Sequence, residues 1–135
     1  MAAGRNNIVV GLVLLATFML VGFALAYMQH LAPNTEQWNA AYATGMHLES
    51  RMAHAHGTLF ALINIAVGLV LLRAPMSELA ARWISWLGLA GLLMPIGIAI
   101  QVVVDIPPVL VIVGGAAMIG CLGWLALRVG TTSEA

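Results

Sequence analysis

Four long stretches of apolar residues dominate this sequence: 8–28, 52–72, 83–104 and 107–127. Each is close to the roughly 20 residues that a helix needs to cross about 30 Å of hydrocarbon. A segment inside lipid must satisfy its own backbone hydrogen bonds, and these stretches are too long and too uniformly apolar for barrel strands. The sequence therefore predicts an all-α fold, an integral membrane four-helix bundle that forms a single transmembrane domain over residues 1–135.

The composition agrees with a chain that lipid surrounds. Hydrophobic residues make up 62% of the sequence and charged residues only 7%, whereas a soluble domain carries about 25% charged residues. A soluble enzyme is therefore excluded, and the lipid bilayer is the expected partner. The basic residues are few and scattered, so nucleic acid is not expected to bind. The single cysteine, Cys121, lies inside an apolar stretch, where it is expected to pack.

The arginines predict the orientation of the chain in the membrane. In a four-span arrangement Arg5, Arg73, Arg82 and Arg128 fall on one side, and only Arg51 falls on the other. Arginine and lysine are enriched in cytoplasmic loops. Both termini are therefore predicted to be cytoplasmic, and the bacterial inner membrane is the expected location.

The first stretch has an alternative interpretation as a signal peptide. Arg5 precedes it, and residues 24–26 have the small-x-small form of a cleavage site. Cleavage would leave three spans. The apolar run exceeds the roughly 7 to 15 residues typical of such peptides, so a retained helix is favoured.

Several single residues predict where helices begin, bend and pack closely. Ser77 and Asp105 are expected to cap the third and fourth helices, and Pro95 is expected to kink the third helix beside Gly97. In lipid, helices approach closely where side chains are small, with Ala116 and Gly120 spaced as an interacting pair. Such residues recur on the last two stretches: Gly88, Gly91, Gly97, Gly114, Gly115, Ala116, Gly120 and Gly123.

Most residues capable of chemistry fall in the outer half of the predicted bundle or in its outer loop. Ionisable groups at membrane depth are costly and usually line a site or a pathway. Four histidines in one short window are therefore a stronger signal than one. The outer set is His30, Glu36, His47, Glu49, Arg51, His54, His56, Asn64, Gln101 and Asp105.

His54 and His56 open the second predicted helix. At about 100° per residue they lie about 160° apart, so a regular helix cannot bring both to one metal ion. Imidazole is a common axial ligand of haem iron, and a flat macrocycle can lie against a helix only where side chains are small. Gly57 stands beside His56, and Ala53 and Ala61 would extend the flat surface. Phe60 and Met52 could flank the ring.

The segment from Arg51 to Thr58, running into residues 65–71, resembles the styrene oxide isomerase family. The resemblance covers about half of the chain, and its one specific part is the histidine of the second helix. It implies a trimeric membrane haem b protein with His56 as the axial, metal-binding ligand. The residue pattern alone leaves open which of His54 and His56 is the ligand, and it places Gly57, Ala53 and Phe60 around the cofactor. The resemblance further implies that ferric haem acts as a Lewis acid, isomerising a small hydrophobic epoxide to an aldehyde through a 1,2-hydride shift.

The chain also departs from the family. Leu62 stands where the family has an asparagine after the ligand histidine, and Gly91 and Ala99 fall where it has an acid and a tyrosine. Haem binding can be retained while the orientation of the substrate passes to other residues. The candidates for that catalytic role are Asn64 and Gln101.

Three alternatives remain open at this point. A haem protein for electron transfer or sensing would need a second axial ligand, such as His54 or His47 from a neighbouring subunit. A cofactor-free transporter or accessory subunit would use the histidines as a proton or metal pathway, and zinc at His47, Glu49 and His54 would require a helix break before Arg51. His54 and His56 could also be polar anchors at a helix end. Whether the chain is an enzyme is left undecided by these patterns.

Overall fold

The computed structural model describes residues 2–104 and 106–131, and these residues form helices and no strand. The all-α prediction is confirmed for them. The elements in chain order are α1 (Ala2–His30), α2 (Thr35–Ala40), α3 (Gly45–Arg73), α4 (Glu78–Gly91), α5 (Leu93–Gln101) and α6 (Val109–Thr131).

Four helical segments are long and apolar enough to cross a membrane: Ala3–His30, Gly45–Arg73, Glu78–Gln101 and Val109–Gly130. The helices extend past most of the predicted bounds. The first begins before residue 8, and the second begins before residue 52. Helical backbone continues into the polar ends because those residues include no proline and can still donate to carbonyls one turn back.

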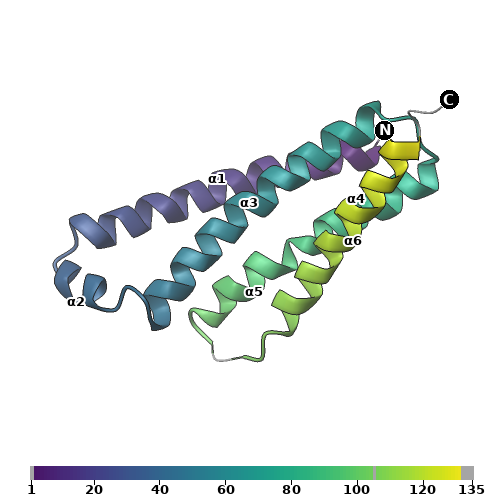
Figure 1. The fold of residues 1–135 in the computed structure, drawn as a ribbon. Helices are drawn as coiled ribbons and strands as arrows, with labels where there is room; N and C mark the ends of the chain where they lie inside the picture. Colours follow the sequence, from purple (N-terminus) through teal and green to yellow (C-terminus); the bar gives the residue numbers. More distant parts are fainter. Residues whose placement is uncertain (1, 105, 132–135) are drawn as a thin grey trace.

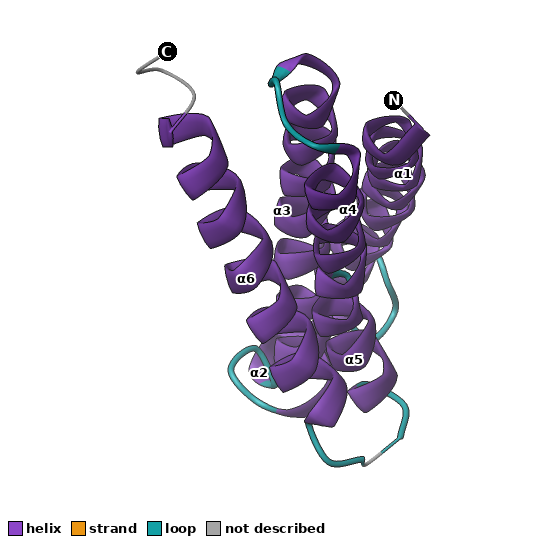
Figure 2. Cartoon of the chain, turned by 90° about the vertical axis from the view of Figure 1, so that its right-hand side faces the viewer, coloured by secondary structure: helices purple, strands orange, loops and turns teal. Residues whose placement is uncertain are grey.

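Figure 1 shows the helices as a long bundle in which α1 and α3 lie side by side and α6 runs beside α4 and α5. Helix α3 is central, since it packs along α1 and also contacts α4 and α5. Figure 2 shows the same bundle from its side, with α6 and α1 at opposite edges. The beginning of α1 and the end of α6 lie at one end of the molecule, and α2 lies at the other (Figure 1).

The third crossing is broken into α4 and α5 at Leu92. Pro95 has no backbone N–H, and its ring would clash with the carbonyl of Gly91 in a regular helix. The chain responds with a tighter turn, in which Leu92 N donates to Leu89 O at 3.1 Å. The kink is confirmed, one turn earlier than beside Gly97.

The two capping predictions have different outcomes. Ser77 caps α4, because its side chain accepts a hydrogen bond from Ala80 N at 3.3 Å. The predicted cap at Asp105 lies outside the described residues.

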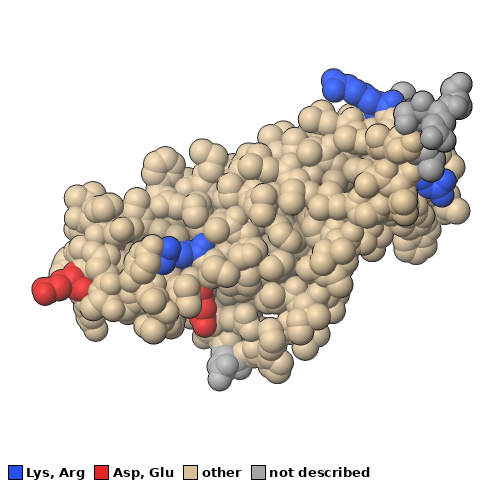
Figure 3. All heavy atoms as spheres, viewed as in Figure 1, with Lys and Arg blue, Asp and Glu red and all other residues tan. Residues whose placement is uncertain are grey.

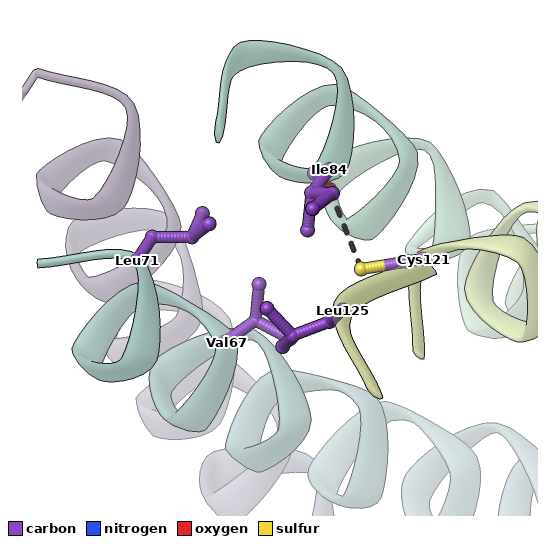
Figure 4. Close-up of a cluster of buried hydrophobic side chains, with 5 residues drawn as sticks. All are labelled: Val67, Leu71, Ile84, Cys121 and Leu125. Carbon is purple, nitrogen blue, oxygen red and sulfur yellow. Dashed lines mark hydrogen bonds between the residues drawn. The ribbon is translucent and has the colours of Figure 1, made fainter. Parts of the chain in front are cut away.

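An apolar cluster joins α3, α4 and α6 near the end of the bundle that holds the chain ends. It consists of Val67, Leu71, Ile84, Cys121 and Leu125 (Figure 4). The Cys121 thiol is buried and donates to Ile84 O at 3.3 Å. The packing role predicted for this cysteine is confirmed.

The small residues of the last two crossings fall into two groups. Gly91, Gly97 and Gly114 are buried at contacts between α6 and the α4–α5 segment, where an added Cβ would meet Met118, Leu110 or the backbone of Met94. Ala116 and Gly120 are instead exposed on the outer side of α6. The predicted close-packing pair is therefore not used within one chain.

Candidate functional site

His54 and His56 lie on different faces of α3, as their spacing predicts. His54 Nδ1 lies 2.8 Å from Phe18 O of α1, and His56 Nδ1 lies 2.9 Å from Met52 O of its own helix. A carbonyl oxygen only accepts, so each Nδ1 carries the proton and donates it. In the neutral imidazole, Nε2 is then the nitrogen with the lone pair, and this is the form that binds a metal.

His56 stands on the outward face of α3. Its ring is partly exposed, and Met52 and Leu59, one turn before and after it, are 42% and 52% exposed. Within the part of the chain that the structure describes, the bond from Nδ1 to Met52 O is the hydrogen bond that its ring makes. Its Nε2 lone pair therefore remains available to a ligand from outside the chain.

His54 is held inside the bundle. Its ring lies against Gly22 of α1, where a Cβ would come within 2.7 Å of the imidazole Cε1. Together with the hydrogen bond to Phe18 O, this contact fixes His54 between α1 and α3. In this chain His54 acts as a polar anchor between helices, as one of the alternatives anticipated.

The small residues beside His56 serve a different purpose from the one predicted. Ala53 and Ala61 are 4% and 0% exposed, and the ring of Phe18 from α1 covers Gly57. The flat surface expected to receive a macrocycle is thus filled by α1. Helices in lipid pack closest at small residues, and here α1 occupies the space that a cofactor would need.

Phe60 also faces inward. It is 8% exposed and packs with Leu92 and Met118, while its ring centroid stays 6.5 Å from that of His56. Of the residues predicted around the cofactor, His56 is the one that the fold turns outward. Ala53, Gly57 and Phe60 pack within the bundle.

His47 is buried beneath α2. It is 2% exposed, its Nδ1 donates to Trp38 O at 2.8 Å, and its ring stacks on that of Trp38 with centroids 4.3 Å apart. The helix runs unbroken through Arg51, and no group of three or more His, Cys, Asp or Glu among the described residues could hold a metal ion. The zinc site considered at His47, Glu49 and His54 is therefore wrong.

Asn64 belongs to a buried polar cluster that sequence reasoning missed. Asn7 Nδ2 donates to Asn64 Oδ1 at 2.8 Å, and Ser85 Oγ donates to Asn7 Oδ1. Asn64 Nδ2 donates to Phe60 O at 3.1 Å and to Gly88 O at 2.9 Å. The cluster joins α1, α3 and α4 past the midpoint of α3, in the half of the bundle that holds the chain ends. The predicted placement of Asn64 in the outer half is therefore wrong.

Gln101, the other candidate for orienting a substrate, holds the turn between α5 and α6. Its Nε2 donates to Ile106 O at 3.1 Å. The structure thus does not bring Asn64 and Gln101 together with His56. One signal could have revealed the cluster around Asn64: Asn7 lies immediately before the first apolar stretch, within reach of a helix that starts early.

Charged side chains gather toward the two ends of the molecule. On the face shown in Figure 3, a long middle section carries neither acidic nor basic side chains. This distribution is that of a chain whose middle faces hydrocarbon and whose ends meet water and headgroups.

The chain matches no protein-family model, no curated protein and no solved structure.

Proposed function

We propose that this protein is an integral membrane haem b protein with His56 as the axial ligand. Its proposed activity is isomerisation of a small hydrophobic epoxide to an aldehyde. The observation that carries the proposal is the state of His56: an outward imidazole whose Nδ1–H is committed to Met52 O at 2.9 Å. A histidine ligand usually donates its other ring N–H in this way, which fixes the tautomer and orients the ring.

One nitrogen donor, His56, would hold haem on the side of α3 that α1 does not cover. The side that carries Gly57 is filled by Phe18, so a macrocycle would lie on the side of His56, where Met52 and Leu59 are exposed. That side faces lipid or a second copy of the chain. A homo-oligomer, a trimer by the family resemblance, would enclose the cofactor between copies.

The positions of His54 and His47 favour Lewis-acid chemistry over electron transfer. His54 lies between α1 and α3, and His47 is buried beneath α2, so neither shares the outward face of His56. His56 would then be the residue of this chain that holds the haem. Ferric haem, when bound, supplies a Lewis acid for an epoxide oxygen.

The chain's own residues would exclude water from this reaction. The side chains flanking His56 are apolar, and excluding water favours rearrangement over hydrolysis to a diol. Asn64 is not assigned to the substrate here, because its amide hydrogens and its carbonyl oxygen are committed inside the bundle. Substrate would enter from the bilayer.

We further propose that both termini are cytoplasmic and that the membrane is the bacterial inner membrane. The arginine distribution supports this orientation. A fluorescent protein fused after residue 135 should then fold and fluoresce, and alkaline phosphatase fused there should be inactive. The reverse pattern would place the termini outside.

The direct test is the visible spectrum of the detergent-purified protein expressed with ample haem. We expect a Soret band that is lost in His56→Ala and retained in His54→Ala, together with conversion of styrene oxide to an aldehyde that is lost with the band. His30→Ala, at the end of α1, serves as the matched surface control. A Soret band that survives His56→Ala, or haem-bound protein that leaves the epoxide intact, would reject the ligand or the activity respectively.

A further inference from the structure

A hollow of about 360 Å³ lies on the outer side of the first turns of α4, at the end of the bundle that holds the chain ends (Figure 1). Its lining consists of Leu79, Arg82, Trp83 and Trp86. Steps of three and four residues place these side chains on one face of the helix. Ile84 and Ser85, on the opposite face, are buried in the bundle. The lined face is therefore the one that α4 turns away from the other helices.

Arg82 gives this hollow its charge. Its side chain is exposed, and it makes no hydrogen bond or ion pair with any residue that the structure describes. Glu78 stands one turn earlier on α4, but it does not line the hollow and does not pair with Arg82. A guanidinium only donates, and its planar fork of N–H groups matches a phosphate in two parallel hydrogen bonds. The hollow therefore presents a positive charge that no acid of its lining compensates.

Two tryptophans place the hollow at the boundary between hydrocarbon and headgroups. Trp83 and Trp86 are 54% and 65% exposed, and within the described part of the chain their indole N–H groups have no acceptor. Tryptophan is enriched at this boundary, because its ring is apolar and its N–H needs an acceptor. Leu79, which is 65% exposed, adds apolar surface. The polar side-chain groups of the lining only donate, so a matching ligand combines oxygen acceptors, negative charge and apolar chains.

We propose that this hollow binds an anionic glycerophospholipid, whose phosphate accepts from the Arg82 guanidinium and whose acyl chains lie along Leu79, Trp83 and Trp86. Basic pockets on membrane helices bind anionic headgroups in this way. A zwitterionic lipid would instead bring a cation close to Arg82, and the lining holds no carboxylate to balance it. The site is separate from His56 and stands whether or not His56 binds haem.

The charges at this end of the bundle favour lipid over a second copy of the chain as the occupant. In a parallel assembly a second copy would have to bring an acid to Arg82, and the described residues of this end offer one, Glu78. Figure 3 shows basic side chains at this end, on the face that it presents. An anionic membrane surface supplies the complementary charge at this height. The arginines of this end are Arg5, Arg73, Arg82 and Arg128.

Quenching of tryptophan fluorescence tests the proposal in phosphatidylcholine nanodiscs that contain a small fraction of phosphatidylglycerol. Bromine on an acyl chain quenches a tryptophan that the chain contacts, so the bromine is placed on each lipid in turn. The ratio of the two quenching constants, corrected for mole fraction, measures the preference for phosphatidylglycerol and cancels general contact with lipid. We expect a preference of roughly three- to tenfold, the effect of one arginine near a membrane surface.

The preference should belong to the hollow and to Arg82. The double variant Trp83→Phe with Trp86→Phe should lose it, because the remaining tryptophans do not line the hollow. Arg82→Gln should lower the ratio to about one, since the phosphate loses its charged donor. Arg5→Gln is the matched control: it removes the same charge from an exposed position at the same end, outside the hollow, and should keep the preference.

A second pair of variants keeps the test informative if Arg82→Gln does not fold. Leu79→Glu places a carboxylate one turn from Arg82 and should abolish the preference, whereas the neutral Leu79→Gln should retain it. The proposal is overturned if the wild type shows no preference, or if Arg82→Gln, Leu79→Glu or the double variant retains it. Loss of the preference in Arg5→Gln would also overturn it, because that result shows only attraction between net charge and an anionic bilayer. None of these outcomes bears on haem at His56.

Discussion

At the scale of single residues, buried amides join three helices, α1, α3 and α4. Asn7 and Asn64 are both 0% exposed, and they face each other across the contact between α1 and α3. In hydrocarbon, water cannot replace a lost partner. Each polar group in this cluster therefore depends on the others.

Asn7→Val should destabilise the protein by about 1–3 kcal/mol, because Asn64 Oδ1 loses its donor and Ser85 Oγ keeps only Ala3 O as an acceptor. Asn6→Val is the matched control, since Asn6 is exposed on the same turn. The free energy of unfolding in mixed micelles is the measurement. In a double-mutant cycle with Asn64→Val, coupling of about 0.5–1.7 kcal/mol is expected. Strictly additive losses would show that the two amides do not interact.

The sequence identified the polar residues of α3 that make specific contacts, but it did not predict which residues they contact. The angular separation of His54 and His56 follows from helical geometry, so their placement on different faces was predictable. The covering of Gly57 by Phe18 was not, because it depends on which helix packs against α3. Asn64 is predicted as a site residue, but its partner Asn7 falls just before the first predicted stretch, 8–28, and is not predicted to face it.

At the scale of elements, the contact between α1 and α3 is made close by glycines on both helices. Gly11 faces the backbone of Ala61, where an added Cβ would lie 2.8 Å from its carbonyl oxygen. Gly57 receives the ring of Phe18, and Gly68 lies against Gly4. Such contacts gain dispersion energy that larger side chains would prevent.

Gly57→Ala should therefore destabilise the protein by about 1–3 kcal/mol, since the new methyl group would overlap the Phe18 ring. The control is Gly115→Ala, where the Cβ would meet only Met94 Sδ at 3.7 Å, and helix propensity should stabilise by up to about 1 kcal/mol. Combining Gly57→Ala with Phe18→Leu should restore part of the loss in the same unfolding assay. Equal effects of the two alanines would contradict this account of the interface.

The four long apolar helices were predictable from hydropathy, because runs of about 20 apolar residues are typical of membrane-crossing helices. Helix α2 was not predicted. It is a short helix in the outer loop, Thr35–Ala40, and its sequence has no apolar periodicity that would predict a helix. Its tertiary contacts with α1 and α3, including the stacking of Trp38 on His47, hold it in place.

At the scale of the whole molecule, α1 and α6 leave wide apolar faces uncovered. In α6, Ile112 and Ile119 are 67% and 75% exposed, and Phe23 of α1 is 70% exposed. Lipid can cover such faces in a single chain. The exposed small residues Ala116 and Gly120 on α6 would also let a second copy approach closely.

Gly120→Leu should therefore shift the detergent-solubilised protein from oligomer toward monomer in sedimentation equilibrium, with little change in the fold of the single chain. An added Cβ at Gly120 has only Leu87 Cδ1 nearby, at 4.0 Å, so the substitution is tolerated within one copy. Ile119→Leu, on the neighbouring exposed position, is the control. If Gly120→Leu leaves the mass distribution unchanged, α6 does not mediate the assembly through this residue.

We propose that His56 would hold haem and would be its one protein ligand. Electron paramagnetic resonance of the ferric wild-type protein, purified after expression with ample haem, tests both parts together. The account predicts a high-spin ferric signal that disappears in His56→Ala. Colourless protein, or a low-spin signal typical of two histidine ligands, would contradict it.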